Sequence, residues 1–72
     1  MTYFERISIK PEIRFGKPCI KGTRISVYDI LSWLASGMSN EKILTDFPEL
    51  TLDDIKAALY YAADKEKRLS VA

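Results

Sequence analysis

The stretch Gly16–Ser26 (GKPCIKGTRIS) decides the fold, because it separates a strand-like beginning from a helical remainder. Its two glycines permit backbone conformations that other residues adopt only with strain. Its proline fixes its own φ angle and favours an extended conformation for the residue before it. Lys17, Lys21 and Arg24 lie within eight residues, with no acidic side chain between them. The stretch therefore predicts a shaped basic loop.

This loop belongs to a longer pattern. GKP at 16–18 and IKGTRISV at 20–27 are followed by GMS at 37–39, FPELT at 47–51 and AAL at 57–59. From about Ile13 to Ala63, this order and spacing resemble the domain of unknown function 433 family. The resemblance implies a predicted antitoxin of a type II toxin-antitoxin pair, with a homeodomain-like helix-turn-helix and a neighbouring PIN-like ribonuclease toxin.

Length and composition predict one small globular domain. The chain has 72 residues and a mass of 8.2 kDa, and 47% of its residues are hydrophobic, which argues against intrinsic disorder. We expect residues 1–72 to form a single domain, with a basic strand and loop segment at 1–25 and a three-helix core at 26–69. A core this small favours a partner, and a homodimer is expected.

Charge divides the chain into two parts. Residues 1–25 carry six Lys or Arg and two acidic residues, for a net charge of +4, whereas the remainder carries five and eight, for −3. This asymmetry predicts one basic and one acidic face, and so two kinds of contact. The alternative is that both faces are simply solvated.

The residues that most enzymes use are scarce. With no histidine and one cysteine, the chain lacks the groups for a metal cluster or for histidine-dependent nucleophilic catalysis. We therefore expect no enzyme activity, no metal and no cofactor. Cys19 has apolar neighbours and is expected in the core. Because the N-terminus shows no signal-peptide pattern, a cytoplasmic location is the default expectation.

Three capping patterns mark the beginnings of three helices. Ser26, Ser39 and Thr51 are expected N-caps, with acidic residues three positions after Ser26 and Thr51. Gly37 should end the first helix, and Pro48 should end a second helix at 40–46 and turn Phe47 inward as a core plug. The third helix should run from Leu52 to about Lys67. Its expected buried stripe consists of Ile55, Ala58, Leu59, Ala62 and Leu69.

Short strands are expected before the helices, at Tyr3–Ile9, Cys19–Lys21 and Arg24–Ile25. The predicted fold is therefore mainly α, a three-helix homeodomain-like helix-turn-helix domain with a short N-terminal β ribbon. The exposed face of the third helix is expected to present Asp53, Lys56, Ala57, Tyr60, Asp64 and Lys67.

DNA binding is the leading functional hypothesis. In a homeodomain-like domain the third helix enters the major groove, but its two exposed acidic residues would repel phosphate. The basic loop has the better charge for phosphate contacts. The predicted DNA-binding residues are Arg14, Lys17, Lys21, Thr23, Arg24 and Lys56. In the alternative interpretation Thr23 and Arg24 are structural, with Arg24 paired to Asp29 or Asp46.

Protein binding is the competing hypothesis. An acidic, aromatic C-terminal half could cover the basic RNA-binding surface of a ribonuclease toxin. The predicted partner-binding residues are Phe47, Tyr60, Tyr61 and Asp64. A third alternative is a protein interaction or structural dimer module without DNA binding.

Overall fold

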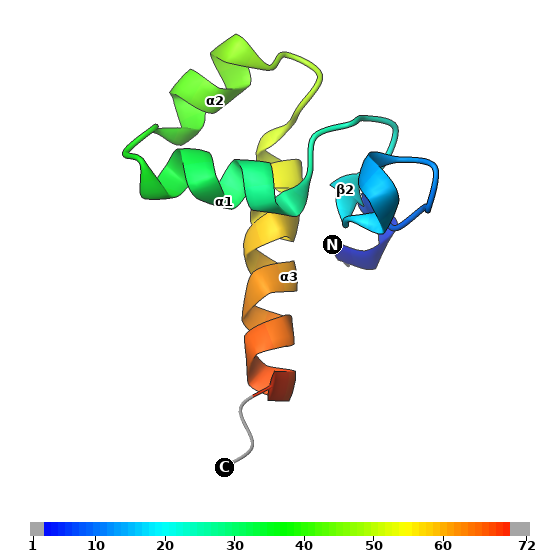
Figure 1. Cartoon of the computed structure of the whole chain (residues 1–72). Helices are drawn as coiled ribbons and strands as arrows, with labels where there is room; N and C mark the ends of the chain where they lie inside the picture. The colour runs from blue at the N-terminus through cyan, green and yellow to red at the C-terminus, as the bar shows by residue number, and fades with distance from the viewer. Residues whose placement is uncertain (1–2, 70–72) are drawn as a thin grey trace.

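The first third of the chain forms a small unit beside three helices (Figure 1). The computed structural model describes residues 3–69, and the side chains of residues 3–67. The unit contains two 3₁₀ turns, η1 and η2, and a two-stranded antiparallel sheet. Its elements are η1 (Tyr3–Glu5), β1 (Ile7–Ser8), η2 (Arg14–Gly16) and β2 (Cys19–Ile20). The expected β ribbon is confirmed, although it is shorter than the sequence predicts.

A proline limits the length of the β ribbon. Ile7 pairs with Ile20 and Ser8 pairs with Cys19, so Ile9 would come opposite Pro18. Proline has no N–H group and cannot continue the ladder. The prediction of a strand over Tyr3–Ile9 is therefore wrong at both ends, because its first three residues form η1.

The strand expected at Arg24–Ile25 is also absent. Only an isolated bridge joins Cys19 to Ser26, and the Ile20 N–H donates to the Ile25 carbonyl at 2.9 Å. These contacts bring the chain back across β2 and directly into the first helix. Cys19 is buried, as predicted.

The first helix, α1 (Val27–Ala35), begins and ends as its sequence predicts. The Asp29 N–H donates to Ser26 Oγ at 2.9 Å, and the Ser26 N–H donates to Asp29 Oδ2 at 3.1 Å. This reciprocal pair is a capping box. Gly37 has a φ of +102° and ends the helix in the left-handed region that glycine favours.

The second helix, α2 (Asn40–Asp46), is capped by Ser39, whose hydroxyl accepts from the Lys42 N–H at 3.1 Å. It ends at Asp46, and Phe47, the residue before proline, is its non-helical C-cap. The Phe47 ring is half-buried, and its centroid lies 4.2 Å from that of Trp33 in a parallel stack. Phe47 leaves the helix and packs against the core together with Trp33, as predicted, although its ring is only partly buried.

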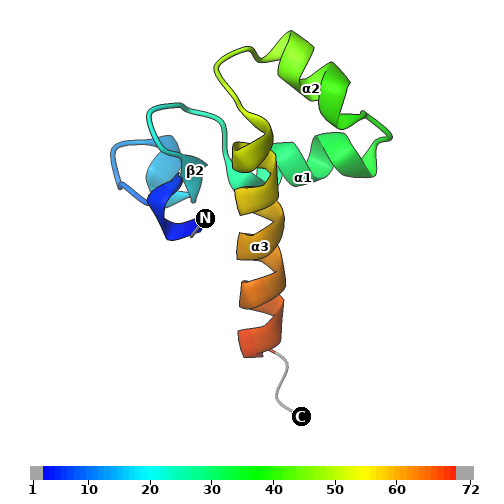
Figure 2. The ribbon, with the colours of Figure 1, turned by 180° about the vertical axis from the view of Figure 1, so that it is seen from behind.

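The third helix, α3 (Leu52–Leu69), begins at a second reciprocal pair. The Asp54 N–H donates to Thr51 Oγ1 at 3.2 Å, and the Thr51 N–H donates to Asp54 Oδ2 at 2.9 Å. In both views α1 crosses α3 near its beginning, and the later turns of α3 extend past α1 and α2 (Figures 1 and 2). The three-helix, mainly α architecture is confirmed.

The buried face of α3 differs from the predicted one. Ile55 and Ala58 are buried as expected, but Leu59 is 47% exposed and Ala57 is fully buried. The reason is that both α1 and η1 pack against α3, so the buried face is turned toward the N-terminal unit. The side chain of Leu69 lies outside the described residues. The core cluster consists of Ile20, Ile25, Val27, Ile30, Ile43, Leu50, Ile55 and Ala58.

Candidate nucleic-acid interface

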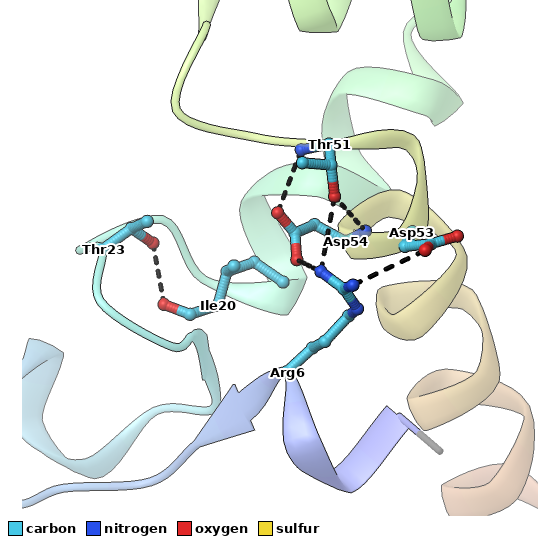
Figure 3. A network of polar contacts seen from close by, with 6 residues as sticks. All are labelled: Arg6, Ile20, Thr23, Thr51, Asp53 and Asp54. Carbon is cyan, nitrogen blue, oxygen red and sulfur yellow. Dashed lines mark hydrogen bonds and ion pairs between the residues drawn. The ribbon is translucent and has the colours of Figure 1, made fainter. Parts of the chain in front are cut away.

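The basic turn, defined here as Lys21–Arg24, is held by a threonine in its centre. Thr23 Oγ1 donates to the Ile20 carbonyl at 2.9 Å (Figure 3). The same oxygen accepts from the Ile25 N–H at 3.0 Å. Gly22 has a φ of +81°, which glycine adopts at little cost. The Thr23 hydroxyl proton is therefore used within the turn, as the structural interpretation of this residue expects.

The Arg14 side chain also holds the basic turn in place through hydrogen bonds. Its Nη1 donates to the Arg24 carbonyl at 2.7 Å and to Asp29 Oδ2 at 2.9 Å. Arg14 and Phe15 both have positive φ values, 53° and 59°, in a region that costs a non-glycine residue roughly 1–2 kcal/mol. The two side-chain bonds of Arg14 link this left-handed segment to the start of α1.

The pairing with Arg14 changes the ionisation of Asp29. Partial burial acts to raise the pKa of Asp29, but hydrogen bonds from Arg14 and Ser26, with the charge of Arg14, outweigh it. The pKa of Asp29 is therefore below its ordinary value. The hydrogen bond to Asp29 and the negative charge of that carboxylate raise the pKa of Arg14. At neutral pH both groups are charged.

Arg24 is left with an exposed side chain. The two carboxylates that the sequence offers as its partners are occupied, Asp29 by Arg14 and Asp46 by Lys42 at 3.2 Å. Among the described residues, Arg24 forms no ion pair. The hypothesis that Arg24 pairs with one of these carboxylates is wrong, because Arg14 pairs with Asp29 and Lys42 pairs with Asp46.

The other two loop lysines are exposed. Lys17 Nζ lies 5.9 Å from the centroid of the Tyr28 ring, within reach of a cation–π interaction. Lys21 is fixed through its backbone, because its N–H donates to the Arg6 carbonyl at 2.8 Å, while its side chain is exposed. Neither lysine forms an ion pair with a described residue.

Arg6 connects the N-terminal unit to α3, a role that the sequence analysis missed. Its guanidinium reaches Asp54 at 3.1 Å, Thr51 at 3.4 Å and Asp53 at 3.5 Å (Figure 3). Asp54 is 6% exposed, so this arginine supplies the positive charge beside a buried carboxylate. Capping and the helix dipole account for the acidic residues at the beginning of α3, so the sequence did not point to Arg6.

The structure divides the remaining predicted residues among different surfaces. Lys56 is exposed on α3, and no described hydrogen bond or ion pair links it to the basic turn. Phe47 lines an open cleft of about 710 Å³ that also includes Arg14, Thr23 and Arg24. Four predicted residues thus meet at one cleft.

The tyrosines of α3 separate. Tyr60 is 59% exposed, whereas Tyr61 is half-buried and its ring meets that of Tyr3 edge to face. Asp64 accepts a hydrogen bond from the Tyr3 hydroxyl at 2.6 Å. Asp64 and Tyr61 therefore help to attach η1 to α3, and Tyr60 alone of the three points outward.

Comparison with known proteins identifies the family. A family model described as a protein of unknown function, DUF433, matches residues 7–62. The chain belongs to the DUF433 family. The match includes the basic turn, the Arg14–Asp29 pair and the capping residues of α1 and α3, and it excludes Arg6 and Asp64.

Two relatives place this DUF433 chain among proteins of other lengths. A crystal structure of a DUF433 member protein from Anabaena variabilis superimposes with a TM-score of 0.81 at 28% identity, over 88% of this chain and 62% of that one. An uncharacterized protein, y4eO, from Sinorhizobium fredii is 38% identical over 58 residues. That alignment covers 81% of this chain but only 26% of the longer relative.

The described part of the DUF433 chain contains neither a cluster of metal-ligating residues nor a helix that could span a membrane. Within it, no three His, Cys, Asp or Glu residues come together as metal ligands would. None of its helices has both the length and the apolar character that crossing a membrane requires.

Proposed function

We propose that this DUF433 chain is an antitoxin-like DNA-binding domain that contacts the phosphate backbone through its basic turn and Lys17. The observation that carries the proposal is that some cations of the N-terminal segment form ion pairs within the chain and others do not. Arg6 and Arg14 form partly exposed ion pairs with carboxylates of α3 and α1, whereas Lys17, Lys21 and Arg24 are exposed without one among the described residues.

Hydrogen bonds fix the backbone that carries these cations, which favours binding. Thr23 and Arg14 hold the backbone of the basic turn, and the Lys21 N–H is bonded to Arg6. Binding then immobilises side chains but need not order the loop, which lowers the entropic cost of association. Exposed Lys and Arg side chains on an ordered backbone are suited to contact with phosphates.

The helix-turn-helix contributes less to this proposed contact than the turn does. Asp46, Glu49 and Asp53 are exposed around the connection between α2 and α3, and they would repel phosphate. We therefore assign phosphate contact to the loop and assign α2 and α3 to the scaffold that supports it. Contacts of this kind fix the position of a protein on DNA and carry little sequence information.

Paired alanine substitutions test this assignment. Lys21→Ala with Arg24→Ala should weaken binding to any duplex by about tenfold or more, because two phosphate contacts are lost. Lys65→Ala with Lys67→Ala is the matched control, since it removes the same charge from α3. Equal losses in the two double variants would show that only net charge matters and would reject the turn as the contact site.

Neutralisation of a ribonuclease toxin is a second proposal, favoured by the exposed acidic residues Asp46, Glu49 and Asp53. A basic RNA-binding surface would complement them. Glu49 forms no ion pair among the described residues, so Glu49→Lys changes this surface without breaking an internal contact. Co-purification with a ribonuclease-like neighbour should be lost in Glu49→Lys, while DNA affinity should not fall, because a cation replaces an acidic residue in the cleft that Arg24 also lines. Undiminished co-purification would contradict the proposal.

A further inference from the structure

One side of α3, next to its buried face, carries a regular stripe of exposed residues. Its members are spaced alternately four and three residues apart, which places them on one side of the helix. Leu52 is 42% exposed and Leu59 is 47% exposed, and neither belongs to the core cluster. We call this stripe the outer seam; it consists of Leu52, Lys56, Leu59, Ala63 and Glu66.

The alternation of four and three residues is the spacing with which two helices pack along each other. The seam runs along the margin of the buried face, because Leu59 follows the buried Ile55 by about one turn. All five seam residues are exposed, so a second helix could approach them without displacing the core. The later turns of α3 extend past α1 and α2 in both views (Figures 1 and 2), and η1 attaches to them through Tyr61 and Asp64, which are not seam residues. With 18 residues, α3 is about 27 Å long, enough for several layers of contact.

From this pattern we infer that the outer seam binds the outer seam of a second copy of this chain, with the two α3 helices antiparallel. In this arrangement Leu59 packs against Ala63 of the partner subunit, and Lys56 lies beside Glu66 of the partner subunit. A two-fold axis passes near Tyr61 along the sequence, and the same contacts repeat on its other side. Such self-complementarity is what a two-fold interface requires.

Charge selects this occupant and this orientation. Among the described residues, neither Lys56 nor Glu66 forms an ion pair, so both are available to a partner. A parallel pairing would place each of these charges beside its own copy and would be repulsive. A partner with a uniformly charged surface would satisfy one of the two and repel the other, whereas an antiparallel second copy satisfies both.

The inference is independent of DNA binding, because none of the loop cations belongs to the seam. It assigns Lys56 to the dimer and removes it from the predicted DNA-binding residues. Tyr60 lies beside the seam and 59% of it is exposed, so the dimer would also cover part of its ring. Aromatic residues are enriched in such interfaces.

The molar mass in solution tests the interface. Analytical ultracentrifugation over a wide concentration range should show a reversible change from 8.2 kDa to twice that mass. Leu59→Lys should leave a folded monomer, because dimerisation would bury the new cation in the interface. Phe15→Lys is the control and should dimerise normally, because Phe15 lies outside the seam. A wild-type protein that stays monomeric, or a dimer unaffected by Leu59→Lys, would overturn the inference.

A charge exchange tests the orientation. Lys56→Glu and Glu66→Lys should each weaken dimerisation by about tenfold, because each replaces two attractive pairs by repulsive ones. The double variant Lys56→Glu with Glu66→Lys should recover wild-type affinity. Within one helix the two positions lie about 15 Å apart, so recovery reports on the contact between chains. Failure of the double variant to recover, with normal helical circular dichroism, would reject antiparallel pairing.

Discussion

The Arg14 guanidinium lies 2.9 Å from the Asp29 carboxylate, and this pair joins a left-handed loop segment to the first turn of α1. Asp29 also accepts the Ser26 N–H at 3.1 Å and thereby completes the capping box. One carboxylate thus serves both the helix and the loop. The position of the basic turn depends on it, because the same arginine bonds the Arg24 carbonyl.

The first prediction concerns acid stability. The pKa of Asp29 is lowered in the folded protein, so its contribution is complete above its unfolded pKa of about 3.9 and is lost as the pH falls through the lower folded value. Asp29→Asn should therefore reduce stability at neutral pH and flatten the loss of stability below about pH 4. Urea unfolding across acidic pH measures this slope. An unchanged slope in the variant would show that other carboxylates control acid unfolding.

Arg6 gives a second prediction. Arg6→Ala leaves the nearly buried Asp54 without its cation and should cost about 2 kcal/mol of unfolding free energy. Arg24→Ala is the control, and because Arg24 is exposed without an ion pair it should change stability by less than about 0.5 kcal/mol. Chemical unfolding of both variants measures the difference. Equal effects would mean that Arg6 does not hold the N-terminal unit to α3.

Phe15 gives a third prediction, of a stabilising change. Its φ is 59° and its side chain is 98% exposed, so it bears left-handed strain without burying its ring. Asparagine tolerates this conformation better, and Phe15→Asn should stabilise the protein by about 0.5–1 kcal/mol. The melting temperature measures this gain. A lower melting temperature would show that the exposed ring contributes to the fold.

Local sequence signals predicted the helix boundaries because their physical causes are local. Ser26 and Thr51 bind groups three residues away, and the residue before Pro48 must leave the helix. The burial of α3 depends instead on η1, which lies more than 40 residues earlier, so Leu59 was misplaced. The same distance in sequence concealed the contact of Arg6 with Asp54.

The candidate interface was predicted in part. The sequence places Lys17, Lys21 and Arg24 in a single loop, and the structure leaves all three exposed. It could not assign Arg14 to an internal role, because that role depends on a left-handed backbone at a non-glycine residue and on Asp29, 15 residues later. Separating exposed cations from internally paired ones required the structure.

The most direct test of DNA binding through the basic turn is the salt dependence of duplex affinity, measured by fluorescence anisotropy. For the wild type, the logarithm of the association constant should fall linearly with the logarithm of salt concentration. Each phosphate contact contributes about 0.9 to the slope, so Lys21→Ala with Arg24→Ala should make it shallower by roughly 2. An unchanged slope in this double variant, or no binding by the wild type at low salt, would contradict the account.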